Sequence, residues 1–234
     1  MNFQRISRLA AVAVSATILS LAAPAQTETA PTVDVALVVA IDVSFSVDST
    51  EHRLQMEGFA TALESEEVLA AITSGPRQKI AIIIFEWSGE DNQGIIIPWT
   101  IIADEASARS VARILAKGPR SVAEGGTAIA SALTYGGQLF ASAPTSPRHV
   151  IDLSTDGRNN AGKPAHQARD ALVASGITIN GLAITNEWAQ LATYLEKHVI
   201  GGGESFVISA TNYDDFAAAM QRKLVKEISG PGTT

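Results

Sequence analysis

The run Val35-Ala-Leu-Val-Val-Ala-Ile41 and the loop Asp42-Val43-Ser44-Phe45-Ser46 that follows it contain the strongest fold signal in this 234-residue chain. An uninterrupted apolar run of this length is typical of a strand in a parallel sheet that is covered on both faces. The loop then presents one carboxylate and two hydroxyls at alternate positions. Mg²⁺ prefers hard oxygen ligands of this kind. The stretch therefore predicts a buried strand whose carboxyl end holds part of a cation site.

Apolar runs and helical patterns alternate along the rest of the chain. Pro98 lies inside one of the runs and favours an edge strand, because proline cannot donate to a sheet ladder. The alternation predicts one α/β domain with a doubly wound, mostly parallel six-stranded sheet, one antiparallel edge strand and helices on both faces. The predicted strands are 35–41, 79–85, 94–101, 149–153, 177–184 and 206–209; one predicted helix follows the capping box at 48–51, and the others are 105–117, 127–140, 164–175, 187–198 and 212–228.

The N-terminus has the pattern of a secretory signal peptide. Arg5 and Arg8 precede the largely apolar stretch Leu9 to Ala23, and small residues follow up to Ala25. A basic start, a short apolar region and an A-x-A exit predict cleavage after Ala25 and export to the periplasm or the exterior, whereas an N-terminal membrane anchor is the alternative. The predicted organisation is a signal peptide at 1–25, a flexible lead-in at 26–32, a domain at 33–229 and a tail at 230–234.

Composition and charge limit the classes of partner. The chain is 46% hydrophobic and 18% charged, contains no cysteine and has a formal net charge of −7. Loss of residues 1–25 removes two arginines and no acid, so the exported chain would carry −9. This balance argues against a nucleic-acid partner and against stable membrane association. Without disulfides, a single sizeable core must stabilise the fold.

Three loops are predicted to converge at the carboxyl edge of the sheet, where ligand sites of such folds gather. Asp42, Ser44 and Ser46 follow the first strand, Asp156 follows the fourth, and Thr127 comes after a glycine pair. Singly, these acids and hydroxyls are also ordinary turn and helix-capping residues. Their arrangement at the ends of neighbouring elements is what indicates a site.

These motifs resemble the metal-ion-dependent adhesion site of von Willebrand factor A domains: D-x-S-x-S, the threonine of G-G-T, and the aspartate of T-D-G. The resemblance covers residues 33 to 229. It implies that Ser44 and Ser46 bind the metal through their hydroxyls and that Asp42 and Asp156 bind it mostly through water. Thr127 would bind directly or through water.

The resemblance further implies a binding module rather than an enzyme. Its metal would be Mg²⁺, or alternatively Mn²⁺ or Ca²⁺, and the open coordination position would accept an exposed Asp or Glu of a protein or peptide partner. Coupling between this binding and a shift of the closing helix is an implication that nothing in the sequence tests.

More narrowly, the chain resembles a secreted bacterial von Willebrand A-like family without an assigned function. The segments that carry this likeness lie at 54–58, 86–88, 98–100, 156–160, 179–182 and 199–202.

Two alternatives remain open from the sequence: a hydrolase that uses the same ion as a Lewis acid, and a structural domain with a vestigial site. Glu86 or Asp152 would be the base in a hydrolase, but the common catalytic motifs are absent. Glu86 is otherwise expected to be a surface acid paired with an arginine, or an extra acceptor beside the site. Asp152, inside a predicted strand, needs a hydrogen-bonding partner.

Other polar and aromatic side chains are expected to have structural roles. Asn159 and Asn160 should shape the loop after Asp156. Trp87 and Trp99 are predicted either to line the rim of the site or to pack in the core. The four histidines, at positions 52, 149, 166 and 198, have no metal-ligand spacing and are expected at the surface or at helix ends.

Overall fold

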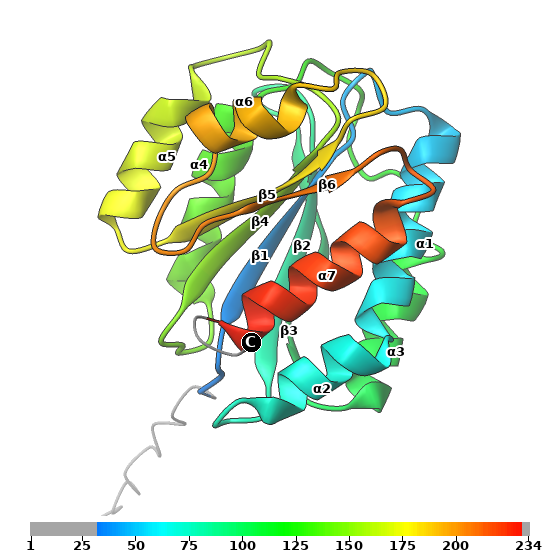
Figure 1. Ribbon diagram of the computed structural model, residues 1–234, viewed down its shortest axis with the longest axis vertical. Helices are drawn as coiled ribbons and strands as arrows, with labels where there is room; N and C mark the ends of the chain where they lie inside the picture. The colour runs from blue at the N-terminus through cyan, green and yellow to red at the C-terminus, as the bar shows by residue number, and fades with distance from the viewer. Residues whose placement is uncertain (1–31, 231–234) are drawn as a thin grey trace, which may run out of the picture.

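A six-stranded sheet forms the centre of the protein, shown in Figure 1 as a computed structural model that describes residues 32–230. The strand order is β3-β2-β1-β4-β5-β6, and only the β2–β3 pair is antiparallel. The predicted sheet is therefore confirmed, with the strand that contains Pro98 at an edge. The strands are β1 Ala36–Asp42, β2 Ile80–Trp87, β3 Gln93–Ile102, β4 His149–Thr155, β5 Thr178–Ile184 and β6 Val207–Ala210.

Helices cover both faces of the sheet, with α1, α2, α3 and α7 on one face and α4, α5 and α6 on the other (Figure 1). The helices are α1 Ser49–Leu63, α2 Glu66–Ser74, α3 Glu105–Leu115, α4 Ile129–Leu139, α5 Ala165–Ala174, α6 Leu191–His198 and α7 Phe216–Ser229, and a 3₁₀ turn spans Phe140–Ser142.

Strand β1 explains why the apolar run has no polar interruption. Leu37, Val39 and Ile41 pack in the core beneath α1 and α7, whereas Val38 and Ala40 pack in the core beneath α4. Successive side chains of a strand point to opposite faces, so a strand buried on both faces needs apolar residues at every position.

The prediction missed α2 and placed several helix ends too far out. Ser65 caps α2 by accepting a hydrogen bond from the Val68 amide, and Glu66 and Glu67 occupy its first turn. This start signal lies directly behind α1, so the two helices read as one pattern. The closing helix α7 begins at Phe216 rather than at Asn212, because the chain first forms turns around Tyr213.

The N-terminal and C-terminal segments fall partly outside the described residues. The predicted signal peptide at 1–25 lies outside them. Within residues 32–230, no helix is long and apolar enough to cross a membrane.

The sheet order places the candidate loops together. Strand β1 lies between β2 and β4, and the chain reverses its direction of growth at this point of the sheet. Ligand sites of open α/β sheets form in the crevice outside the strand ends at such a switch point. Asp42, the last residue of β1, pairs in register with Trp87, the last residue of β2.

Candidate metal site

The five predicted site residues come together at the carboxyl ends of β1 and β4. Asp42 is 1% exposed at the end of β1, and Ser44 and Ser46 lie in the loop before α1. Thr127 precedes α4, and Asp156 directly follows β4. Ser44, Thr127 and Asp156 are buried, whereas Ser46 is half-buried, so the cluster opens to solvent beside Ser46.

Hydrogen bonds connect the three loops through these side chains. The Thr127 hydroxyl donates to Ser44 Oγ at 3.3 Å, and Ser44 Oγ lies 3.4 Å from Ser46 Oγ. Ser46 Oγ donates to Asp156 Oδ1 at 2.7 Å. Residues as far apart in sequence as Ser44, Thr127 and Asp156 therefore share one polar network.

Protein donors orient both carboxylates. Asp42 accepts hydrogen bonds from the Ser44 amide at 2.8 Å and from the Thr155 hydroxyl. Asp156 accepts from the Ser46 hydroxyl through Oδ1 and from the Tyr213 hydroxyl through Oδ2 at 3.0 Å. Each carboxylate is thus held by two donors, which fixes its orientation before any ion binds.

The electrostatics of the cluster favour a cation. Burial raises the pKa of Asp42 to about 7, and the nearby charge of Asp156 adds to the shift. Among residues 32–230, no lysine or arginine forms an ion pair with either aspartate. A bound divalent ion would supply the missing positive charge.

The donor set fits a hard divalent ion. It consists of two carboxylates and three hydroxyls, which are oxygen donors of the kind that Mg²⁺ takes. In the described part of the chain, no group of three or more His, Cys, Asp or Glu side chains is arranged to hold a metal. An ion held here would therefore be bound by two carboxylates and three hydroxyls rather than by a cluster of acids and histidines.

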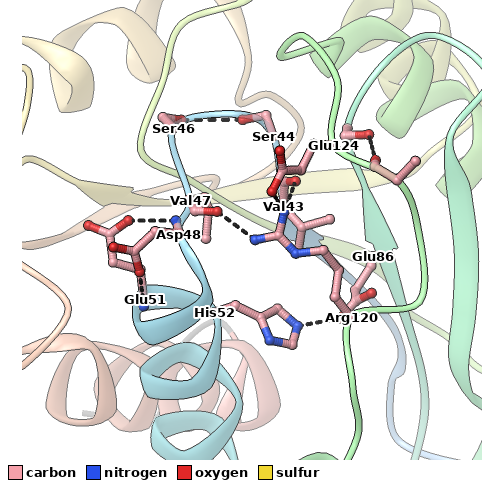
Figure 2. Close-up of polar contacts among 12 residues, drawn as sticks. Val43, Ser44, Ser46, Val47, Asp48, Glu51, His52, Glu86, Arg120 and Glu124 are labelled. Carbon is pink, nitrogen blue, oxygen red and sulfur yellow. Dashed lines mark hydrogen bonds and ion pairs between the residues drawn. The ribbon is translucent and has the colours of Figure 1, made fainter.

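Arg120 fixes the backbone of the loop that carries the two serines. Figure 2 shows its guanidinium directed to main-chain carbonyls at both ends of that loop, those of Val43 at 3.3 Å and of Val47 at 2.5 Å. It also pairs with Glu124 at 3.3 Å. One side chain from a distant loop therefore sets the curvature of the segment between Val43 and Val47.

Comparison with known sequence families assigns the chain to one of them. A family described as "Protein of unknown function (DUF1194)" matches residues 32–232. The chain belongs to the DUF1194 family. No curated protein matches it.

Solved structures show that this DUF1194 chain has the von Willebrand A fold, as the sequence predicted. Proximal thread matrix protein 1 from the mussel byssus, with a zinc-occupied MIDAS motif, matches at a TM-score of 0.65 and 19% identity; the match covers 84% of this chain and 48% of that one. A von Willebrand factor type A protein from Catenulispora acidiphila matches at a TM-score of 0.60 and 19% identity; the match covers 84% of this chain and 43% of that one. The vWF domain of the type V pili tip protein Mfa5 from Porphyromonas gingivalis matches at a TM-score of 0.55 and 13% identity; the match covers 83% of this chain and 95% of that one. This chain spans about half of the length of the mussel protein.

Glu86 of this DUF1194 chain is neither a surface acid nor paired with arginine, so that expectation was wrong. It is 1% exposed, and its carboxylate contacts His52 Nε2 at 2.7 Å and accepts from the amide and hydroxyl of Ser121 (Figure 2 shows the His52 contact). Burial alone would raise the pKa of Glu86, but these hydrogen bonds outweigh burial and lower it. The cluster anchors the loop that continues to Thr127.

The expectation for His52 was also wrong, because this histidine is buried in α1 rather than exposed. His166, exposed on α5, and His198, at the end of α6, lie as expected. His149 does not, because it is half-buried at the start of strand β4 and stacks on Phe140.

The two asparagines after Asp156 shape their loop, as predicted. Asn160 Oδ1 accepts from the Thr127 amide at 2.7 Å, and Asn159 Oδ1 accepts from the Ala130 amide at 3.3 Å. Asn160 also donates to the Thr127 hydroxyl at 3.4 Å. The asparagines thereby connect the loop after β4 to the start of α4.

The remaining polar and aromatic predictions resolve to structural roles in the DUF1194 fold. Trp87 is fully buried in the core, and Trp99 donates its indole N–H to the Leu139 carbonyl at 3.2 Å. Asp152 has the partner that it required, Lys223 of α7, whose Nζ lies 2.6 Å from Asp152 Oδ1.

Sequence reasoning missed three side chains that support the DUF1194 site. Arg120 and Tyr213 contact it from loops that no motif marks, and Thr155 contacts it from the end of β4. The role of Thr155 could have been predicted, because this residue directly precedes Asp156 in the T-D-G motif. Arg120 and Tyr213 contact the site only through the fold, and no local pattern indicates them.

Proposed function

We propose that the chain is an exported binding module that depends on a divalent metal. Asp42, Ser44, Ser46, Thr127 and Asp156 would hold the ion, with Mg²⁺ as the first choice and Mn²⁺ or Ca²⁺ as alternatives. The observation that carries the proposal is the convergence of these oxygen-bearing side chains in one hydrogen-bonded network at the switch point of the sheet.

When bound at these oxygens, the ion would offer an open coordination position to the carboxylate of a partner's Asp or Glu. The protein's own side chains hold the ligands in place. Arg120 fixes the loop, Thr155 and Tyr213 orient the carboxylates, and Asn160 fixes the backbone at Thr127. Such supporting contacts are what give a metal site its affinity.

The names of the structural relatives support binding rather than catalysis. One relative is a matrix protein with a zinc-occupied MIDAS motif, and another is a domain of a pilus tip protein. The acids that a hydrolase would need as a base also have other roles here. Glu86 accepts from His52 and Ser121, and Asp152 is paired with Lys223 inside the core.

The exported state is part of the proposal. We keep residues 1–25 as a signal peptide, 26–32 as a lead-in, 33–229 as the domain and 230–234 as a tail. N-terminal sequencing of the protein from an expressing bacterium tests this, because export predicts a mature chain that begins near Gln26. An intact Met1 on the exported protein would contradict it.

Thermal melting tests the metal site. Addition of MgCl₂ or MnCl₂ to EDTA-treated protein should raise the melting temperature, because binding at 100 times the Kd stabilises the folded state by about 2.7 kcal/mol. For a domain of this size that corresponds to about 5–10 °C. Asp42→Ala should abolish the shift. Asp170→Ala, which removes an exposed acid of α5, is the matched control and should retain it.

Partner binding is tested separately. Protein–protein capture from the native envelope fraction is compared for wild type, wild type with EDTA, and Asp42→Ala. A partner that is retained only by the metal-loaded wild type supports metal-bridged binding. A partner that is retained equally in EDTA would contradict it.

A further inference from the structure

A second cavity lies at the opposite end of β4 from the metal site. Its volume is about 540 Å³, within the range of small-molecule sites. It is bounded by the C-terminal half of α7, the amino ends of β4 and β5, and the glycine loop 201–204. In Figure 1, α7 crosses this face of the sheet and ends near the position marked C.

Below the cavity, two carboxyl groups share one ammonium group. Lys223 Nζ lies 2.6 Å from Asp152 Oδ1 and 2.5 Å from Glu227 Oε1, and all three side chains are fully buried. Asn180 adds a hydrogen bond to Glu227 Oε1 at 2.9 Å. With both carboxyls ionised, Lys223 balances one of the two negative charges. The guanidinium of Arg148 lies nearby and donates to the main-chain carbonyls of Glu227 and Ile228.

One carboxyl group of this cluster borders the cavity. Glu227 lines the cavity, and its Oε2 has no hydrogen-bond partner among residues 32–230. Burial, then the charge of Asp152, raises the pKa of Glu227 to about 8. A buried carboxyl oxygen without a donor is costly. A ligand's ammonium group would donate to it and favour the ionised carboxylate, so Glu227 would release its proton as the ligand binds.

The edge of the cavity carries two basic residues beside one exposed acid, Glu204. Arg222 and Lys226 are exposed on α7 at its edge, and Lys226 Nζ lies 4.1 Å above the ring of Phe206. The apolar part of the lining consists of Val150, Phe206 and Val225, and Arg148, Thr178 and Asn180 line the cavity as well. The cavity therefore combines basic groups at its edge, an apolar part of its lining and a carboxyl group.

The glycine loop gives the wall an unusual backbone. Glu204 has a φ of 58° and Gly202 a φ of 94°, and a Cβ at Gly202 would come within 2.9 Å of Thr178 Cα. A non-glycine residue in the left-handed region costs free energy and is often retained at ligand sites. The 179–182 and 199–202 segments noted in the sequence meet here, since Ile179 pairs with Gly201.

We infer that this cavity binds a small zwitterion with an apolar body, such as a free apolar amino acid. The ligand's ammonium group pairs with Glu227, its carboxylate lies near Arg222 and Lys226, and its side chain packs on Phe206 and Val225. This site does not depend on the metal site, because the two lie at opposite ends of the sheet.

Titration calorimetry on the full exported chain in EDTA tests the inference, with L-leucine and L-phenylalanine as probes. Octanoate provides the carboxylate without the ammonium group, and hexylamine provides the ammonium group without the carboxylate. At least one amino acid should bind with one-to-one stoichiometry, at least tenfold more tightly than octanoate and hexylamine. Absence of amino-acid binding at millimolar concentration, or equal binding of octanoate, would overturn the inference.

Charge-removing variants locate the site. Arg222→Gln combined with Lys226→Gln should weaken amino-acid binding at least fivefold. Lys117→Gln, which removes an exposed lysine just after the end of α3, should not change it. Glu227→Gln should weaken binding as well. If that buried substitution prevents folding, chemical shifts in the wild type replace it. Amino-acid-dependent shifts at Asn180 and Gly201 support the site, and shifts confined to other regions contradict it.

Discussion

The hydroxyl of Tyr213 donates to Asp156 Oδ2 at 3.0 Å, so the loop that leads into α7 contacts the candidate metal site directly. Tyr213 is 5% exposed, and burial raises its pKa, which keeps the hydroxyl protonated as a donor. Asp156 therefore owes half of its orientation to a residue 57 positions away.

Tyr213→Phe is predicted to weaken Mg²⁺ binding about tenfold, because removal of one contact that orients a ligand typically has this effect. The ring volume is retained, so the melting temperature in EDTA should change little. A Mg²⁺ titration followed by thermal melting measures both quantities. Tyr135→Phe on α4 is the control, and equal weakening in the two variants would contradict the assigned role.

Thr127 provides a test of hydroxyl ligation at nearly constant volume. Thr127→Val is predicted to abolish most of the Mg²⁺-dependent rise in melting temperature, whereas Thr127→Ser should retain it. The backbone at this position is held by Asn160 in all three proteins. Full metal response in the valine variant would show that the hydroxyl is not needed.

Arg120→Ala is predicted to lower stability by about 1–3 kcal/mol, because two main-chain carbonyls lose a charged hydrogen-bond donor. Mg²⁺ affinity should fall as well, since the loop with Ser44 and Ser46 is then less ordered. Arg120→Lys should retain only part of the stability and of the Mg²⁺ affinity, because an ammonium group lacks the planar fork of a guanidinium. Urea unfolding with and without Mg²⁺ measures them, and Arg113→Ala on α3 is the control.

Local signals explain what could be predicted from sequence. The apolar run of β1 and the D-x-S-x-S loop belong to one continuous segment, so the sequence alone indicates the strand and three of the site residues. Pro98 indicated the edge because its effect on a ladder is local. The fold and the central residues of the site followed from such segments.

Long-range contacts explain which features could not be predicted from the sequence. His52 looked like a surface residue of α1, and only the position of Glu86 on β2 shows that it is buried. Lys223 is partly an exception. It lies between Met220 and Leu224 on the apolar side of α7, and Asp152 was known to need a partner, so their pairing was within reach of the sequence.

Glu86→Ala is predicted to lower the free energy of unfolding by about 2–4 kcal/mol. The change leaves His52 and Ser121 without their buried acceptor. Denaturant unfolding in EDTA measures the loss. Glu196→Ala, on the exposed side of α6, should cost much less, and similar losses in both variants would argue against the anchoring role.

The buried carboxyl of Glu227 predicts a pH dependence of stability. Its folded pKa of about 8 exceeds the ordinary value of 4.5, so the folded state retains a proton that the unfolded state releases. The free energy of unfolding should therefore fall between pH 5 and 8, by up to roughly 1 kcal/mol per pH unit. Asp152, Lys223 and Asn180 face the Glu227 carboxyl group, and these three residues are the same in wild type and in a Glu227 variant.

Glu227→Gln should flatten this part of the stability profile in EDTA, measured by urea unfolding at several pH values. Asp42 contributes a slope of the same sign, so a residual decline is expected in the variant. An unchanged slope would show that Glu227 does not retain a proton in the folded state.

The register that sets Trp87 beside Asp42 gives the protein a built-in optical reporter. Trp87 is fully buried, and its main-chain carbonyl accepts the Val43 amide at 2.9 Å, so the backbone joins it to the first loop of the site. We expect its emission to respond to changes at that edge of the sheet, whereas Trp99 lies on β3 and Trp188 in the loop before α6. Occupancy of the site can thus be followed by intrinsic fluorescence in the unlabelled chain.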